Sequence, residues 1–406
     1  MVKKISLLLS LFLFLSCARD RQDRETIMFQ PYFTGSLSQG IHELTDSLNE
    51  ERSSVRLVAT PMEHEDFKIN IRLQLDTENP PDIFTYWAGA RTSYLVEREK
   101  IVPIETLIDS TSIKKSFKES VLEACSYEGK LYMLPLTQHY IGFFYSKEVF
   151  RELGLEEPSS WKELLAGAGK IRESGRNPFA LGSRNRWPAQ FWFDYLLLRT
   201  SGFRYREELM AGKARFSDEK VLRVFDLWKE LLDKDFFNRD HSELTWAQAA
   251  DQLKRGESAM TLMGTWIIPY MEDYEIGFFP FPILDSSVEQ VALGPIDGAL
   301  VAANSSKQKA SGEVLKELAK ADAQIVFNRK SGAMIPHSGV GREIYSDIQL
   351  EILKEMDKSS YWAFNYDLAT TPLRSEAGLD FFAAFLREPS QYRELANDLQ
   401  ERVSDY

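Results

Sequence analysis

The sequence predicts an α/β protein of two lobes joined by a hinge. Short apolar segments typical of strands occur at residues 26–29, 55–59, 82–86, 141–145, 258–263 and 274–279. The first three alternate with helical patterns and short joins, which indicates a parallel βαβ unit. Breaks at 135–140 and 294–298 each separate two apolar strands. Repeated breaks of this kind are expected where a chain passes back and forth between two lobes.

Length and composition are those of a globular protein. The chain has 406 residues, of which 44% are hydrophobic and 27% charged, enough for about two to three domains. The net charge of -12 argues against nucleic acid as a partner, because phosphate binding needs a basic face. After residue 20, no segment is long and apolar enough to span a bilayer.

The N-terminus has the pattern of a secretory signal. Lys3 and Lys4 precede an apolar run at 5–15, and Ser16-Cys17 follows. A small residue before cysteine resembles a bacterial lipoprotein cleavage site, so residues 1–17 are interpreted as a signal whose Cys17 carries the lipid. Residues 14 and 15 are bulkier than that pattern usually has, and ordinary secretion with loss of Cys17 is the alternative.

A charged tether and a single further cysteine complete the description of the exported chain. Residues 18–26 are charged and lack an apolar period, so they are expected to be a solvated tether. Cys125 would have no partner after lipidation of Cys17. We therefore expect no intrachain disulfide and a buried thiol at Cys125.

Several helices carry recognisable start signals. Ser160 with Glu163, and Thr245 with Gln248, have the spacing of capping boxes. Other helical patterns are predicted at 37–50, 64–76, 146–153, 189–199, 221–232, 309–320 and 322–330. The pattern at 64–76 also alternates like a strand, but it is long and charged, and a helix is favoured.

The stretch at 128–147 is interpreted as the first crossing between the lobes. A short strand is predicted at 131–134, a break at Pro135, and a second strand at 141–145. Residues 135–137 are expected to act as the hinge, with Gln138 and His139 facing the cleft. An ordinary loop is the alternative.

These segments together resemble family 1 of the extracellular solute-binding proteins, which feed bacterial carbohydrate ABC importers and include maltose-binding proteins. The matching segments are PDIF at 81–84 with WAG at 87–89, GKLYMLP at 129–135, FYSKEVF at 144–150, PSSWKEL at 158–164, GESAM at 256–260 with GTW at 264–266, and DG at 297–298. They occur in the family's order and cover about residues 27–340.

The resemblance implies a type II periplasmic-binding-protein fold, with a ligand cleft between lobes joined by a multi-strand hinge. The N-terminal lobe would comprise residues 27–137 and 294–336, and the C-terminal lobe 138–293 and 337–406. It also implies a monomer that binds a carbohydrate, performs no chemistry, needs no cofactor or metal, and docks on ABC permease subunits. Its lipid would hold it at the outer face of a bacterial membrane.

A sugar site needs flat aromatic rings for the C–H faces of the pyranose and polar side chains for its hydroxyls. The aromatic candidates, taken from loops, are Tyr32, Trp87, Trp187, Trp266 and Trp362. The polar candidates are Gln30, Gln138, His139, Arg186, Asp297 and Arg374. Core packing is the alternative for each tryptophan, a hinge hydrogen bond for His139, and a turn cap for Asp297. Trp161 and Trp228 lie on apolar helix faces and are assigned to the core.

Other functions remain open on the sequence alone. A glycoside hydrolase would need two carboxylates across the cleft, whereas most acidic residues lie on helix faces expected to be solvated. GxSxG, HExxH and P-loop patterns are lacking, and five histidines without ligand spacing argue against zinc. A peptide, polyamine or glycerol phosphate could be the bound solute, and a sensor subunit is a further alternative.

Overall fold

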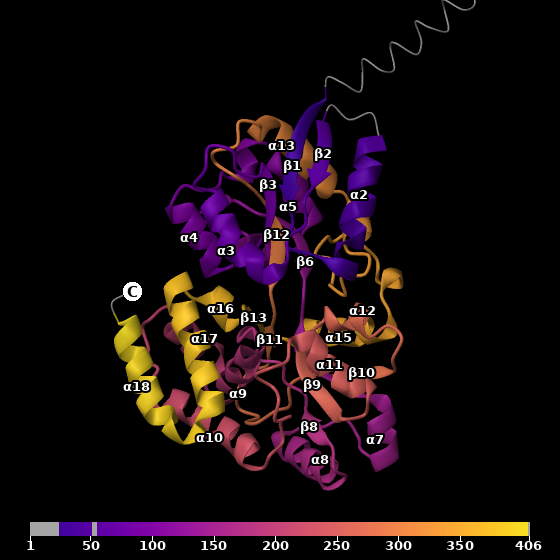
Figure 1. The fold of residues 1–406 in the computed structure, drawn as a ribbon. Helices are drawn as coiled ribbons and strands as arrows, with labels where there is room; N and C mark the ends of the chain where they lie inside the picture. The colour runs from indigo at the N-terminus through magenta and orange to yellow at the C-terminus, as the bar shows by residue number, and fades with distance from the viewer. Residues whose placement is uncertain (1–23, 51–54, 405–406) are drawn as a thin grey trace, which may run out of the picture.

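The protein folds into two stacked α/β lobes, each built around its own sheet (Figure 1). The computed structural model describes residues 24–50 and 55–404. The expected signal, Cys17 and most of the expected tether lie outside the described residues. The first strand begins at Glu25, inside the range 18–26 predicted for the tether.

The first sheet forms the core of the N-terminal lobe and has the strand order β2-β1-β3-β12-β6. Its strands are β1 (Glu25–Gln30), β2 (Val55–Ala59), β3 (Ile83–Trp87), β6 (Leu134–Gln138) and β12 (Ile296–Val301). β1 pairs in parallel with both β2 and β3, which confirms the predicted parallel βαβ unit. β12 then runs antiparallel to β3 and β6, so the sheet is mixed. The helices of this lobe are α2 (Gln39–Glu50), α3 (His64–Gln74), α4 (Ala90–Glu97), α5 (Ser110–Ser116), α6 (Glu119–Ala124), α13 (Gln308–Leu318) and α14 (Ala321–Phe327).

The second sheet, of order β10-β7-β9-β8, forms the core of the C-terminal lobe. Its strands are β7 (Ile141–Ser146), β8 (Asn177–Phe179), β9 (Ser258–Gly264) and β10 (Ile276–Phe279). Two small sheets, β4 (Ser126–Tyr127) with β5 (Lys130–Leu131) and β11 (Val291–Leu293) with β13 (Tyr361–Ala363), complete the strands described. The helices of this lobe are α7 (Lys147–Leu153), α8 (Trp161–Glu173), α9 (Gln190–Met210), α10 (Glu219–Asp233), α11 (Trp246–Lys254), α12 (Ile267–Tyr270), α15 (Asp347–Lys358), α16 (Tyr366–Ala369), α17 (Pro372–Arg387) and α18 (Tyr392–Val403).

Local signals in the sequence predict several helices well. Both capping boxes are present, at Ser160 with Glu163 and at Thr245 with Gln248. The helix predicted at 64–76 forms α3, because Phe67 and Ile71 bury one face at a spacing of four residues. α9 is longer than the predicted 189–199, since it continues to Met210 through a kink at Gly202, where φ is 77°.

The predicted proline break at 135 is wrong, because β6 runs through Pro135. β6 is an edge strand, where a residue without an amide proton costs no ladder hydrogen bond. Side-chain amides from α14 and the residue that follows it occupy the exposed acceptors: Gln324 donates to the Pro135 carbonyl (3.1 Å) and Asn328 to that of Leu136 (2.9 Å). The strand predicted at 131–134 is interrupted, because Leu131 ends β5 and Leu134 begins β6.

Buried apolar side chains form two clusters, one in each lobe. The cluster of the N-terminal lobe draws on residues 27–136 and 296–327, and that of the C-terminal lobe on 140–293, 334 and 352–403. Leu368 is an exception, because it follows β13 in the chain yet packs in the N-terminal cluster. The domain limits given by the sequence stay a prediction. Trp228 is fully buried, and Trp161 packs against the same C-terminal cluster.

Three crossing segments lie side by side at the hinge. The His139 amide donates to the Pro295 carbonyl at 3.0 Å, which joins the first crossing to the second. Gln138 and Met334 exchange two backbone hydrogen bonds of 2.9 Å, which joins the first crossing to the third. A methyl group on Gly294 would lie 1.8 Å from the His139 carbonyl oxygen, so only glycine allows the first two segments to approach this closely.

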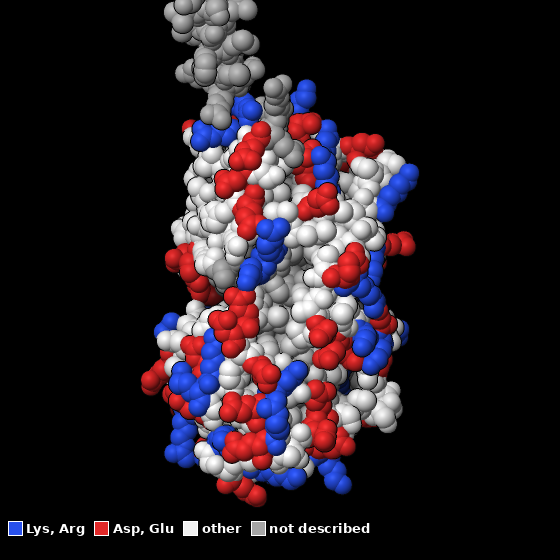
Figure 2. Space-filling model, turned by 90° about the vertical axis from the view of Figure 1, so that its right-hand side faces the viewer, with Lys and Arg blue, Asp and Glu red and all other residues white. Residues whose placement is uncertain are grey.

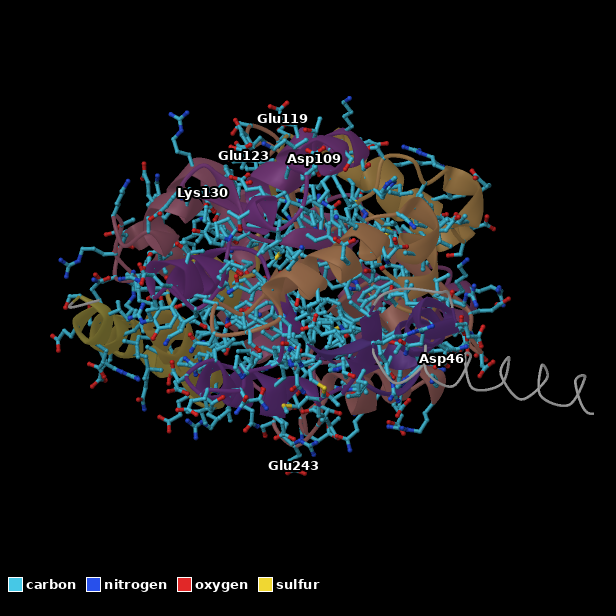
Figure 3. The ribbon with its side chains drawn as sticks, turned by 90° about the horizontal axis from the view of Figure 1, so that it is seen from above. Asp46, Asp109, Glu119, Glu123, Lys130 and Glu243 are labelled. Carbon is cyan, nitrogen blue, oxygen red and sulfur yellow. The ribbon has the colours of Figure 1, made fainter. Side chains whose placement is uncertain are left out.

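Charged side chains are distributed over the outer surface. Figure 2 shows acidic and basic groups interspersed over one whole face, without a continuous basic patch among its described residues. Seen from above, Asp46, Asp109, Glu119 and Glu123 project outward from the lobe that carries them (Figure 3).

Cys125 is a free, buried thiol, and burial raises its pKa. Within the described ranges, the helices include none that is long and apolar enough to cross a membrane.

Candidate solute-binding site

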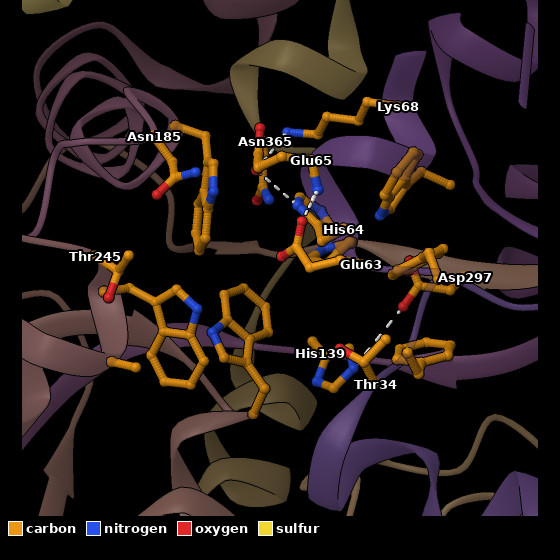
Figure 4. A pocket seen from close by; sticks show the side chains of 18 of the residues that line it. Thr34, Glu63, His64, Glu65, Lys68, His139, Asn185, Thr245, Asp297 and Asn365 are labelled. Carbon is orange, nitrogen blue, oxygen red and sulfur yellow. Dashed lines mark hydrogen bonds and ion pairs between the residues drawn. The ribbon is translucent and has the colours of Figure 1, made fainter. Parts of the chain in front are cut away.

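A cavity of about 550 Å³ lies between the lobes, next to the three crossing segments (Figure 4). This volume falls in the range of about 300–1,000 Å³ that is usual for small-molecule sites. Both lobes contribute to its wall. The lining residues are Tyr32, Phe33, Thr34, Gly35, Glu63, His64, Glu65, Lys68, Trp87, His139, Arg184, Asn185, Trp187, Gln190, Thr245, Trp246, Ala247, Trp266, Tyr270, Pro295, Asp297, Ser331, Asn365, Asp367 and Leu368.

The wall of the N-terminal lobe is a stacked aromatic pair. Trp87 is the last residue of β3, and Tyr32 follows the end of β1, so two neighbouring parallel strands deliver both rings to one edge of the sheet. The rings lie 4.4 Å apart between centroids at an interplanar angle of 30°. The Tyr32 amide donates to the Thr85 hydroxyl at 3.1 Å, which fixes the loop that carries the ring.

The wall of the C-terminal lobe carries four further aromatic rings. Trp187 starts the 3-10 helix η3 (Trp187–Ala189), and its centroid is 5.9 Å from that of Trp266, which precedes α12. Trp246, at the start of α11, lies 5.2 Å from Tyr270. Trp187 also meets His64 of the opposite lobe at 5.9 Å between centroids. The cavity is therefore bounded on both sides by aromatic surfaces.

Asp297 is a buried acid of the cavity wall, with 1% of its surface exposed. Its Oδ2 accepts a hydrogen bond from the Thr137 hydroxyl at 2.5 Å, whereas its Oδ1 is buried without a hydrogen-bond partner among the described residues. Burial raises the pKa of Asp297 to about 6, and the neighbouring hydroxyls of Thr137 and Tyr32 limit the rise. A buried carboxylate oxygen without a partner is costly, so a ligand that donates a hydrogen bond would be favoured here.

His139 lies beside Asp297 at the first crossing. Its Nδ1 is 2.8 Å from the Thr265 hydroxyl, and its Nε2 is 3.8 Å from Asp297 Oδ2. Burial lowers the pKa of His139 to about 3, so the imidazole is neutral at physiological pH. Its ring also packs edge-on against Trp266, at 5.3 Å between centroids. The crossing thus contributes a neutral polar group to the cavity.

A second acid, Asp367 of α16, lines the cavity from the C-terminal lobe. Gln190 holds it with two hydrogen bonds, from its Nε2 to Asp367 Oδ1 (2.9 Å) and from the Asp367 amide to its Oε1 (2.8 Å). Asn365, two residues earlier, is 5% exposed, and its Oδ1 has no hydrogen-bond partner within the described chain. Two of the lining residues, Asp297 and Asn365, therefore each carry a buried acceptor without a partner among the described residues.

The start of α3 supplies the charged groups of the N-terminal lobe. Lys68 Nζ lies 3.6 Å from Glu65 Oε1, and His64 Nδ1 lies 2.8 Å from the same oxygen. Burial alone would raise the pKa of Glu65, but the His64 hydrogen bond and the Lys68 charge bring it down to about 2. Figure 4 shows His64, Glu65 and Lys68 grouped together beside Asn365.

Six of the eleven candidate residues line the cavity: Tyr32, Trp87, His139, Trp187, Trp266 and Asp297. The other five do not. The Gln30 side chain turns away to donate to the Thr60 carbonyl (2.9 Å), and the Gln138 backbone pairs with Met334 instead.

The remaining three candidates outside the cavity have partners within the C-terminal lobe or at the second crossing. Arg186 forms ion pairs with Glu376 (2.8 Å) and Asp380 (2.6 Å) of α17. Trp362 donates its ring N–H to the Gly294 carbonyl at 2.9 Å. Arg374 is 5% exposed, and it donates to the carbonyls of Val403 and Leu209.

Sequence reasoning missed several lining residues, chiefly Lys68, Trp246, Tyr270, Asn365 and Asp367. Trp246 carried a signal, because it directly follows the predicted cap Thr245 and so had to lie at a helix start. Asp367 and Asn365 carried none, because their position depends on how α16 packs against the other lobe.

Comparison with known proteins gives the family. Residues 38–325, well over half of the chain, match the family model described as "Bacterial extracellular solute-binding protein". The chain belongs to this family. The confirmed parts of the prediction are thus the family and the two-lobed fold.

Among individual proteins, the chain is 26% identical over 358 residues to an uncharacterized ABC transporter extracellular-binding protein of Pyrococcus horikoshii, covering 85% of this chain and 79% of that protein. It is 26% identical over 248 residues to the multiple sugar-binding protein of Streptococcus mutans, covering 57% and 58% of the two chains. The solved structure of the bacterial solute receptor AcbH superposes with a TM-score of 0.87 at 24% identity, covering 94% of this chain and 99% of that one. This likeness shows that the family member described here has the same two-lobed fold.

Proposed function

We propose that the protein is the sugar-binding subunit of an ABC importer. The observation that carries this proposal is the combination of aromatic walls on both lobes with a buried, unsatisfied acceptor at Asp297. Flat rings match the C–H faces of a pyranose, and the carboxylate of Asp297 and the amide of Asn365, each with an oxygen that lacks a partner, match hydroxyl donors at its rim. Tyr32, Trp87, Trp187 and Trp266 would stack on the sugar, and Asp297 and His139 would bind its hydroxyls.

The mechanism is closure of the two lobes around the sugar. Three hydrogen-bonded crossing segments support a hinge, because a few residues at the ends of elements can absorb the rotation of whole lobes. Closure brings the aromatic walls together and removes water from both, so binding and closure are energetically coupled. The closed form then docks on permease subunits and hands over the sugar.

The names of related proteins support the choice of solute and partner. A relative is named as an ABC transporter extracellular-binding protein, and another as a multiple sugar-binding protein. AcbH is described as having an exclusive substrate preference for β-D-galactopyranose. A chain this similar in fold would bind a mono- or oligosaccharide in the corresponding cleft.

Export and anchoring are part of the same proposal. The positive residues, the apolar run and Ser16-Cys17 at the N-terminus support lipid attachment at Cys17 on the outer face of a bacterial membrane. The protein would act there as a monomer. Mass spectrometry of the protein isolated from its own membranes tests the anchor: a lipid mass on Cys17 supports it, and a mature chain that begins after Cys17 contradicts it.

A thermal-shift screen tests the solute. A solute that binds only the folded protein at 100 times its Kd stabilises it by about 2.7 kcal/mol. We expect a rise in Tm with at least one of D-galactose, maltose, maltotriose and xylobiose, confirmed by calorimetric titration. A rise with spermidine, a tripeptide or glycerol phosphate alone would overturn the choice of sugar. Release of reducing sugar during the titration would instead indicate a hydrolase.

A further inference from the structure

Arg91 reaches from the N-terminal lobe into the C-terminal lobe. It stands in the first turn of α4, and only 3% of its surface is exposed. Its Nε donates to the Asp367 carbonyl at 2.9 Å, and its Nη2 lies 3.3 Å from the Ser375 hydroxyl. Its guanidinium carbon also lies 5.9 Å from the centroid of Trp87, within cation–π range. A buried cation is thus satisfied largely by groups of the opposite lobe.

The carboxylate of Asp367 is held from both lobes. Gln190 of its own lobe bonds Oδ1, while Arg91 Nη2 lies 3.5 Å and Lys68 Nζ 3.9 Å from Oδ2. Asp367 has 4% of its surface exposed and lines the cavity. Two cations of the N-terminal lobe therefore fix the one acid that α16 presents to the cavity.

Packing of α16 reinforces this contact. Tyr366 packs in the cluster of the C-terminal lobe, whereas Leu368 packs in that of the N-terminal lobe. The loop before α4 lies directly on α16, because a methyl group on Gly89 would be 2.5 Å from the Leu368 carbonyl oxygen. A helix of four residues thus belongs to both cores, and Arg91 is its polar connection to α4.

We propose that Arg91 is a positioning residue and the latch of the closed arrangement. It holds Asp367 in the cavity and raises the population of the closed form even without ligand. Separation of the lobes breaks the contact between Arg91 and Asp367 and removes Leu368 from an apolar core. The free energy of opening therefore depends on the Arg91 contact. If only the closed form binds the solute, the measured affinity also depends on Arg91, because Arg91 raises the population of that form.

The part of this inference that concerns the solute rests on the proposed function, whereas the latch does not. Two measurements separate them. Pulsed electron paramagnetic resonance reports the distance between spin labels at Leu73→Cys on α3 and Leu373→Cys on α17, both exposed positions in different lobes. A Cys17→Ser background leaves only the buried Cys125 as native thiol. Titration calorimetry with the sugar that raises Tm reports affinity.

Arg91→Ala is expected to lengthen the label distance in the ligand-free protein and to weaken sugar binding by roughly 10- to 100-fold, the worth of a hydrogen bond to a charged group. Arg91→Lys keeps a positive charge near Asp367 but loses the guanidinium group that reaches Ser375. Its label distance and its sugar affinity should therefore lie between those of Arg91→Ala and the wild type. Asp367→Asn keeps the backbone acceptor of Arg91 and should give an intermediate distance change.

Glu272→Gln is the matched control, because it removes an exposed ion pair with Lys330 that links the segment after α12 to the segment before the third crossing. It should change neither the distance nor the affinity. Equal distance distributions for wild type and Arg91→Ala without sugar would overturn the latch. If the label distance is longer in Arg91→Ala but the wild type binds no sugar, the latch is supported and the proposed function is rejected. Circular dichroism verifies that each variant is folded.

Discussion

The Thr137 hydroxyl donates a hydrogen bond of 2.5 Å to one carboxylate oxygen of Asp297, and the other oxygen is buried without a hydrogen-bond partner among the described residues. The two residues face each other in the register of β6 and β12, beside a β-bulge at Asp297 and Gly298. A bulge re-aims a side chain locally, and here it lies where the acid enters the cavity. The strand pairing of the hinge therefore also orients the acid proposed to bind the solute.

Asp297→Asn is expected to stabilise the ligand-free protein at neutral pH. The pKa of Asp297 is about 6 in the folded protein and about 3.8 in the unfolded chain, so the folded state binds the proton more tightly. The wild type therefore loses stability from this group as pH rises from about 4 to 6. Each unit of pKa is worth about 1.4 kcal/mol, so the variant should gain up to roughly 3 kcal/mol at pH 7 and nothing near pH 3.

Urea denaturation between pH 3 and 8 measures this difference, with Asp46→Asn at an exposed position as a control for lost surface charge. The same Asp297→Asn variant should bind sugar at least about tenfold more weakly, because a charged acceptor is lost. Greater stability with unchanged affinity would remove Asp297 from the proposed site. If the Asp297→Asn variant were less stable than the wild type at pH 7, burial of the charged Asp297 carboxylate would not be destabilising as assigned here.

Removal of a stacking ring should weaken sugar binding without unfolding the protein. We expect Trp87→Ala and Trp266→Ala each to raise Kd roughly tenfold or more, because each deletes most of one apolar platform. Trp161→Ala is the control: Trp161 stacks on Phe281 at 6.0 Å between centroids, away from the cavity, so its loss should lower Tm and leave Kd unchanged. Unchanged affinity in both cavity variants refutes the stacking proposal.

Gly294→Ala should disturb the hinge. The new methyl group would lie 1.8 Å from the His139 carbonyl oxygen, so the first two crossings would have to separate. We expect a loss of about 1–3 kcal/mol in the free energy of unfolding, measured by urea denaturation. Gly167→Ala in α8 meets no atom within 4 Å and should instead gain about 0.5–1 kcal/mol. Equal effects of the two changes would show that the crossings tolerate a larger spacing.

His139 should remain neutral across the physiological range. Burial lowers its pKa to about 3, so its ring ¹⁵N chemical shifts are expected to keep the values of a neutral imidazole between pH 5 and 8. Nuclear magnetic resonance measures this directly, and a His139→Gln sample assigns the signals. A titration step of His139 inside that range would mean that Asp297, 3.8 Å away, stabilises the imidazolium instead.

Features set by local rules were predicted from the sequence. The capping boxes at Ser160 and Thr245, the βαβ unit, and the rings of Tyr32 and Trp87 after strand ends all follow from neighbours in the chain. The local rule failed at Pro135, because it took no account of the strand's place at the edge of the sheet.

Features set by distant partners could not be predicted in this way. Arg186 and Arg374 were predicted to bind the ligand, but their side chains bind other partners. Asp380 lies 194 positions from Arg186 and Val403 lies 29 positions from Arg374. Nothing in the local sequence distinguishes Asp367 from the many other acidic residues, although Gln190 and Arg91 hold it at the cavity. Contacts between residues far apart in the chain thus decide which charged side chains line the cavity, and the spacing of residues in the sequence does not predict these contacts.

The edge strand β6 has a consequence for the behaviour of the protein in a crowded compartment. Pro135 has no amide proton to offer, and the carbonyls of residues 135 and 136 already accept the amides of Gln324 and Asn328. An extended segment of another molecule would find little to pair with at this rim. Pro135 and the two side-chain hydrogen bonds at this edge thereby also disfavour strand exchange and aggregation between neighbouring copies.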